Sequence, residues 1–101
     1  MAVALHNLGF TYLVLERHTE DIAAFEESVP LAQDLGNRYI HADDLNGIAR
    51  ALHSQGRIPD AQEMNRRALA VFDDLPDAEA ARYRSQLDVS PLRYPPEGDG
   101  G

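Results

Sequence analysis

The sequence predicts an all-α protein in which antiparallel helical hairpins stack as an α-solenoid. Three observations predict this fold: an internal repeat, helical spacing of large apolar residues within each unit, and helix-ending residues at matching places. Segment 4–12 aligns with 44–52, and 21–31 aligns with 61–71, at a constant offset of 40 residues (45 − 5 = 40). Large and small residues that recur over a whole unit are the signature of stacked supersecondary units.

The first helix of each unit has large apolar residues at i, i+3 and i+7, which places all three on one helical face. These residues are Leu5, Leu8 and Tyr12 in unit one, and Leu45, Ile48 and Leu52 in unit two. Gly9 and Ala49 occupy equivalent positions, and their small size lets neighbouring helices approach closely. The second helix of unit one carries a matching stripe of Ile22, Phe25 and Val29.

Residues that begin and end helices agree with this division. Thr19, followed by two acidic residues, predicts the start of the second helix. Gly36 can adopt the left-handed conformation that ends this helix, and Asn37 can cap the next. Gly56 ends the third helix, and Pro59 suits the first turn of the fourth. We therefore expect five helices, over residues 2–15, 19–35, 38–55, 59–74 and 77–88.

The expected organisation is one helical domain followed by a tail. It comprises a repeat domain, 1–88 (repeats 2–37 and 38–76, capping helix 77–88), and a disordered C-terminal tail, 89–101. In the capping helix, three alanines are expected to pack on unit two while the charged residues face water. The alanines are Ala78, Ala80 and Ala81, and the charged residues are Glu79, Arg82 and Arg84. The Pro- and Gly-rich composition after residue 88 predicts disorder and is typical of a natural chain end.

Several positions depart from the regular pattern. Asp21 and Ser28 stand where small apolar residues are expected, and Glu16 stands where glycine is expected. Asn65 aligns with Phe25 at the offset of 40, so the second hairpin is expected to be under-packed there unless a neighbour fills the space. Pro30 lies inside the second helix and predicts a bend near residues 26–30 rather than a break, at a cost of about 3 kcal/mol. A kink that reshapes a binding face is the functional alternative.

Composition excludes several classes of function. The net charge is −8, from 17 acidic and 9 basic residues, which argues against direct nucleic-acid binding and favours basic or apolar partners. The chain has no cysteine, so it has no disulfide, thiol nucleophile or Cys-based zinc site. No apolar run approaches the ~18 residues of a membrane span, and the first residues do not form a signal peptide. The predicted location is the cytoplasm.

Residues that carry catalytic chemistry do not form a recognisable site. No two of the histidines His6, His18, His41 and His53 are spaced i, i+4 on one helix, so no metal-binding helix motif is present. The adjacent acidic pairs at 26–27, 43–44 and 73–74 point about 100° apart on a helix, so they predict solvated faces rather than an acid/base dyad. The sequence therefore predicts no catalytic residues, no metal, no cofactor and no enzymatic activity.

The repeated unit resembles the tetratricopeptide repeat. The resemblance rests on a bulky apolar residue, then Leu-Gly three and four positions on, then an aromatic residue: Leu5, Leu8-Gly9 and Tyr12. The offset of 40 exceeds the family's usual 34 and looks like the long-repeat variety at the C-terminus of large bacterial transcriptional regulators. Those include antibiotic-regulatory activators and other nucleotide-switch regulators. All nine basic residues are arginine, which fits a high-GC bacterial genome.

In this family the first helix of each unit lines a concave groove, and the resemblance implies a groove here. The implied residues are Val3, His6, Phe10, Leu13 and Val14 from unit one, and Asp43, Asn46, Arg50, His53 and Ser54 from unit two. The unit-one strip is apolar, and the unit-two strip is polar. Asn46 and Arg50 lie one turn apart and could bind a peptide backbone or a carboxylate. Phe10 and Val14 form a ligand surface or, alternatively, are covered by a preceding repeat.

The expected function is a protein–protein interaction scaffold that binds a peptide or protein segment in this groove. The alternative is a C-terminal sensor segment, or a truncated remnant, of a larger nucleotide-switch transcriptional regulator. Two repeats and one helix fall short of the ~3 repeats that such stacks need. We therefore also expect a homodimer or intramolecular partner domains, and neither direct nucleic-acid nor membrane contact.

Overall fold

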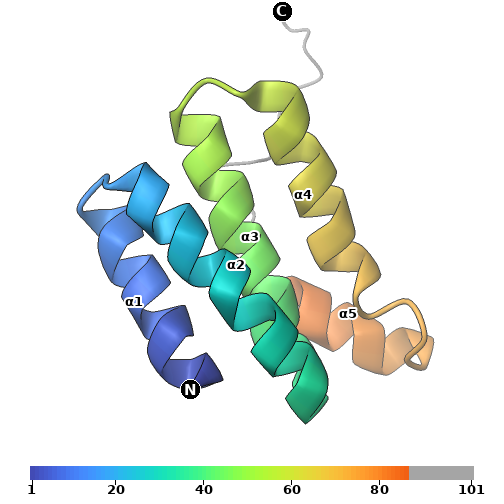
Figure 1. The fold of residues 1–101 in the computed structure, drawn as a ribbon. Coiled ribbons are helices and arrows are strands. Elements are labelled where there is room, and N and C mark those ends of the chain that lie inside the picture. Colours follow the sequence, from blue (N-terminus) through green and yellow to red (C-terminus); the bar gives the residue numbers. More distant parts are fainter. Residues whose placement is uncertain (87–101) are drawn as a thin grey trace, which may run out of the picture.

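The computed structural model describes residues 1–86 and, within them, five helices and no strand (Figure 1). The helices are α1 (Ala2–Val14), α2 (His18–Leu35), α3 (Arg38–Ser54), α4 (Ile58–Ala70) and α5 (Asp77–Gln86). The predicted all-α helical repeat fold is confirmed. The predicted tail, 89–101, and the last two residues of the predicted capping helix lie outside the described residues.

The turns between the helices follow the expected chemistry, with one shift. Gly36 and Gly56 adopt left-handed conformations with φ of 69° and 79°. The Asn37 side chain accepts a hydrogen bond from the Ile40 N–H and so caps α3. Glu16, which aligns with Gly56, also has a positive φ of 60°, because the first hairpin needs the same turn. The α2 helix begins at His18 after an Arg17 cap, so the predicted start at Thr19 was one residue late.

Helices α1 to α4 run antiparallel in succession, and each packs against the next (Figure 1). The α1 helix also reaches α3, so the first three helices form one packed group. Helix α2 continues through Pro30 without ending, as expected of a bend rather than a break. Helix α4 ends at Ala70, four residues before the predicted end, and the chain then turns toward α5.

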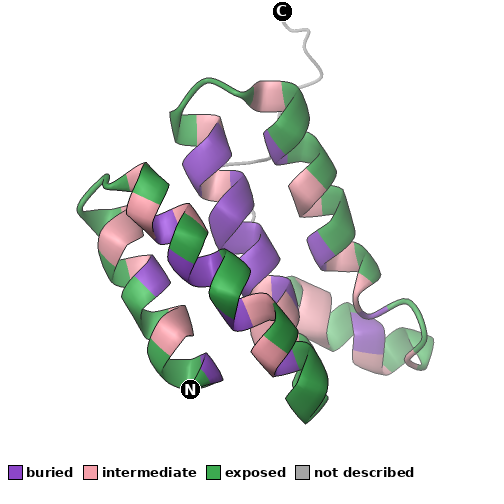
Figure 2. Ribbon diagram, in the orientation of Figure 1, coloured by how far each residue is buried: buried purple, intermediate pink, exposed green. Residues whose placement is uncertain are grey.

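Helix α3 is buried along most of its length (Figure 2). The core of the first three helices is built around Phe25, which is fully buried. Its ring lies between two glycines, Gly9 of α1 and Gly47 of α3. A Cβ atom placed on Gly9 would lie 2.6 Å from the Phe25 ring, and one on Gly47 would lie 2.5 Å from it. Phe10 packs on the same ring edge-to-face, at a centroid distance of 4.8 Å. Both glycines are therefore required by packing rather than by backbone conformation.

The second hairpin uses a different aromatic residue. Asn65 aligns with Phe25, and the side chain that fills the core there is instead Phe72, which is fully buried just after α4. Tyr83 of α5 stacks on Phe72 with ring centroids 5.3 Å apart. The aromatic stack thus joins α5 to the core that α3 and α4 share.

Helix α5 caps this end of the stack, but through only one of the three predicted alanines. Only Ala80 of its three alanines is buried, whereas Ala78 and Ala81 are exposed. Arg84 was predicted to face water; its Nε donates to the Leu69 carbonyl at 3.0 Å, and its guanidinium pairs with Asp73. The prediction failed because α5 approaches the core through Phe72, beyond the end of α4.

Substitution Gly47→Ala tests the close approach of α3 to Phe25. Alanine is the better helix former by about 1 kcal/mol, yet the added methyl group overlaps the Phe25 ring, and overpacking costs about 1–3 kcal/mol. We expect a net loss of stability in urea denaturation. A Phe25→Leu background makes room for the methyl group, so the cost of Gly47→Ala should shrink there. A higher melting temperature for Gly47→Ala alone would contradict the packing.

Candidate functional site

The residues of the predicted groove divide into a closed part and an open part. His6 of α1 pairs with Asp43 of α3, and Asn46 of the same helix hydrogen-bonds Asp43. Phe10 and Val14 line an open hollow at the C-terminal half of α1. Sequence spacing placed all of these on one strip, but the first group is mostly covered and the second is open.

The closed part is centred on His6, whose two ring nitrogens face two carboxylates of α3. The Nδ1 lies 2.6 Å from Oδ1 of Asp44, and the Nε2 lies 3.4 Å from Oδ2 of Asp43. Both nitrogens donate at once only in the imidazolium form. The hydrogen bond that His6 donates to Asp44, assisted by the charges of both carboxylates, accordingly raises the pKa of His6 against the opposing effect of burial.

The two carboxylates are not the solvated helix face that the sequence predicted. The Asp44 side chain is 0 % exposed, and the Asp43 side chain is 16 % exposed. Burial raises the pKa of Asp43, and the nearby His6, Arg50 and an Asn46 hydrogen bond oppose that rise. A buried carboxylate is tolerated because it is paired, so His6 and Asp44 together fix α1 on α3.

Asn46 was predicted to hold a peptide backbone, and this prediction is wrong for the described conformation. Its side chain is fully buried and hydrogen-bonds Asp43, so it cannot also reach a ligand at the surface. The Asn46–Arg50 carboxylate clamp therefore loses one of its two residues. Arg50 and His53 are only partly buried.

The open part is a shallow apolar hollow of about 350 Å³ on α1, lined by Phe10, Thr11, Val14 and Leu15. Val14 is 81 % exposed, which is unusual for an aliphatic side chain of a helix. Phe10 is half-buried, with one edge on Phe25 and the other against the His6 ring at 5.0 Å. Of the remaining predicted residues, Leu13 is half-buried, and Val3 and Ser54 are exposed.

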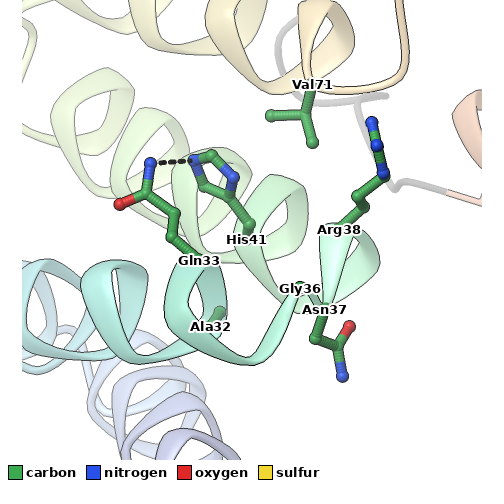
Figure 3. A pocket seen from close by; sticks show the side chains of 7 residues that line it. All are labelled: Ala32, Gln33, Gly36, Asn37, Arg38, His41 and Val71. Carbon is green, nitrogen blue, oxygen red and sulfur yellow. Dashed lines mark hydrogen bonds between the residues drawn. The ribbon is translucent and has the colours of Figure 1, made fainter. Parts of the chain in front are cut away.

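A second hollow, of about 270 Å³, lies where α2 turns into α3 (Figure 3). Its polar side chains are Gln33, Asn37, Arg38 and His41, with Val71 from the far side. These polar groups already have partners within the chain. Gln33 Nε2 lies 3.5 Å from His41 Nε2, Arg38 pairs with Asp74, and Asn37 caps α3. No sequence pattern predicts this hollow, because Val71 is distant from α2 along the chain.

The remaining histidine and acidic contacts are structural. His18 Nδ1 lies 3.0 Å from Oδ2 of Asp21, which is fully buried, and burial raises the pKa of that carboxyl. Ser28, the other polar residue at a small apolar position, donates to the Ala2 carbonyl at 3.2 Å. Within residues 1–86, no three His, Asp or Glu side chains are grouped so as to hold a metal ion. No helix of that part is long and apolar enough to cross a membrane.

The fold and the sequence pattern both agree with the comparison to known protein families. The family described as tetratricopeptide repeat matches residues 1–74, about three quarters of the chain. The chain belongs to the tetratricopeptide repeat family. No curated protein and no solved structure matched it. Tetratricopeptide repeats are non-catalytic scaffolds that generally mediate protein–protein interaction, which agrees with the absence of catalytic motifs in the sequence.

Sequence reasoning missed one important residue of this tetratricopeptide repeat. Asp44 aligns with Ala4 at the offset of 40, yet Asp44 is fully buried whereas Ala4 is exposed. A buried acid needs a partner from a neighbouring helix, and His6 is that partner. The repeat register did not show that Asp44 is buried, and spacing alone does not identify His6 as its partner.

The His6 pair predicts a pH-dependent stability. The folded chain binds the His6 proton more tightly than the unfolded chain, whose histidine pKa is about 6.5. His6 therefore stabilises the fold fully below pH 6.5, and this stabilisation is lost as pH rises through the raised pKa of His6. Between about pH 6 and 8, we expect the free energy of unfolding to fall less in His6→Gln than in the wild type, as measured by urea denaturation.

His41 provides a matched control with the opposite sign. Burial lowers the pKa of His41, so its contribution is present above pH 6.5 and is lost as pH falls. The free energy of unfolding of His41→Gln should therefore fall more steeply with rising pH than that of the wild type. If His6→Gln leaves the pH profile of the wild type unchanged, the imidazolium between Asp43 and Asp44 does not exist in solution.

Proposed function

We propose that the chain is an interaction scaffold that binds a peptide or protein segment through the open part of its groove. The single observation that carries this proposal is the apolar hollow on α1, with Val14 81 % exposed beside Phe10. Apolar surface is less stable in water than when it is covered. A bound apolar side chain would therefore gain roughly 25 cal/mol of favourable binding free energy per Å² of apolar surface that it covers. Phe10 is held in place by Phe25 and His6, so the binding surface is rigid before the ligand arrives.

The polar residues of α3 favour a ligand with a defined direction. Arg50 and His53 of the predicted groove are partly exposed, and both belong to the helix next to α1. A peptide would place an apolar side chain on Phe10 and Val14 and its polar backbone groups toward α3. The net charge of −8 favours peptides with basic flanking residues, because opposite charges raise the rate of encounter.

The second candidate is a sensor segment of a larger nucleotide-switch transcriptional regulator. The observation that favours it is the 40-residue offset, longer than the usual repeat and similar to the repeats of such regulators. In that setting the partner of the hollow would be another domain of the same polypeptide. The cytoplasmic location stays a prediction that both candidates share.

Substitution Val14→Asp tests the proposed binding surface. Selection of a random-peptide phage library on the immobilised chain should enrich peptides with an apolar anchor residue. Fluorescence anisotropy of a selected peptide should then show at least tenfold weaker binding to Val14→Asp. The bound peptide would have to remove water from the new carboxylate, which costs free energy.

The matched control is Leu35→Asp, which places the same charge on another exposed leucine, 72 % exposed and outside the hollow. Its affinity should equal that of the wild type. Failure to enrich any peptide, or equal binding by Val14→Asp and the wild type, would overturn the peptide-binding proposal and favour an intramolecular partner.

A further inference from the structure

Helix α1 has a second exposed face, whose counterpart in α3 is buried. Four of its residues are exposed, and the four residues of α3 at the offset of 40 are all buried. The exposed residues are Ala4, Asn7, Leu8 and Thr11; their counterparts are Asp44, Gly47, Ile48 and Ala51. Leu8 is 42 % exposed, whereas Ile48 is 3 % exposed. Helix α3 packs against α1, α2 and α4. Helix α1 packs against α2 and α3, and within the described residues this second face of α1 stays exposed.

This face carries no formal charge, in contrast to the rest of the chain. Helix α1 contains no Asp, Glu, Lys or Arg, while each of the other four helices contains at least two acidic residues. In a chain with a net charge of −8, it is the one described helix on which two copies can meet without repulsion between acidic side chains. A helix that is apolar over most of its circumference is normally buried on more than one side.

The spacing of the exposed residues is that of a helix–helix seam. Met1, Ala4, Leu8, Thr11 and Leu15 follow one another at intervals of 3, 4, 3 and 4 residues, which is the a/d pattern of a coiled coil. Large side chains at 1, 8 and 15 alternate with smaller ones at 4 and 11. Such a face is complementary to itself, because the large residues of one helix fill the space beside the small residues of the other.

The opposite end of the stack is not available for the same kind of contact. Helix α5 covers it through Ala80 and through Tyr83 on Phe72. The surface that remains there is edged by charged Arg66, Asp73 and Arg84. Head-to-tail stacking would place these charges against the apolar face of α1, so the two ends do not match.

We propose that two copies of this chain form a two-fold symmetric dimer through the outer faces of their α1 helices, packed antiparallel with Leu8 near the axis. In this arrangement Met1 of each copy lies toward Leu15 of the other, and Leu8 lies beside its own copy. A symmetric contact closes on itself. Thr11 and Leu15 of this face also line the hollow of Phe10 and Val14, so the dimer contact and the hollow share one edge of α1.

The size of the face sets the strength of the dimer. A 13-residue helix is about 20 Å long, so two such faces bury roughly 800–1,000 Å² in total. This area lies at the low end for specific interfaces, and the expected dissociation constant is on the order of 10–100 µM.

Sedimentation equilibrium of the full chain over roughly 5–500 µM, a range set by that dissociation constant, tests the proposal. The expected mass rises from the 11.2 kDa monomer to twice that value. Leu8→Glu brings two carboxylates together at the axis, so it should remain monomeric throughout, with circular dichroism unchanged. The matched control Leu35→Glu changes an equally apolar exposed leucine outside the face and should dimerise like the wild type.

A single introduced cysteine tests the two-fold arrangement directly, since the chain has no cysteine of its own. Leu8→Cys should form a disulfide-linked dimer under mild oxidation, because its Cα atoms come within the ~7 Å that a disulfide allows. Leu35→Cys should not. A wild type that stays monomeric at all concentrations, a ladder of larger polymers, or a dimer that tolerates Leu8→Glu would each overturn the proposal.

Discussion

The contact of Phe25 with Gly9 and Gly47 is the constraint on which the rest of this structure depends. One ring occupies the space between α1 and α3, and it fits only because neither helix has a side chain at the point of contact. The position of α1 relative to α3 is therefore set by a single aromatic residue of α2. That position brings His6 within 2.6 Å of Asp44, and it holds Phe10 edge-to-face on Phe25. The closed and open parts of the predicted groove both follow from it.

The chain places polar groups where a repeat of this kind needs only small apolar ones. Asp21, Ser28 and Asp44 are fully buried, and each has a partner: His18, the Ala2 carbonyl and His6. Such pairs contribute little net stability compared with apolar packing, because desolvation of the charge offsets most of the attraction. They do fix which helix faces which, since a slipped register would leave a buried carboxylate without a partner. The pair between His6 and Asp44 also makes this specificity sensitive to pH, because the neighbouring carboxylate raises the pKa of the imidazole.

Helix α1 combines three roles on three faces. One face packs on α2 and α3 through Gly9 and His6, a second carries the hollow of Phe10 and Val14, and a third presents Ala4, Asn7 and Leu8 to solvent. The two outer faces contain no Asp, Glu, Lys or Arg, so a contact on either of them desolvates no charged side chain of α1. The second unit is different: α3 is enclosed by its neighbours, and its end of the stack is covered by α5. Within residues 1–86, most of the exposed large apolar side chains therefore lie at the α1 end.

The sequence by itself determined the elements, the order in which they stack and the chemistry of the turns. Its 40-residue register, the i, i+3, i+7 spacing and Gly36, Asn37 and Gly56 are local signals, and local hydrogen bonding and helix geometry suffice to interpret them. Even Glu16 was identified as occupying a glycine position, and its φ of 60° agrees. The tertiary structure alone decided which residues of a helical face are covered. Asn46 and Asp44 differ from exposed residues only in what the neighbouring helix places beside them, and the aromatic residue of the second hairpin came from beyond α4. Burial depends on side chains brought together from distant parts of the chain, which helical periodicity does not encode.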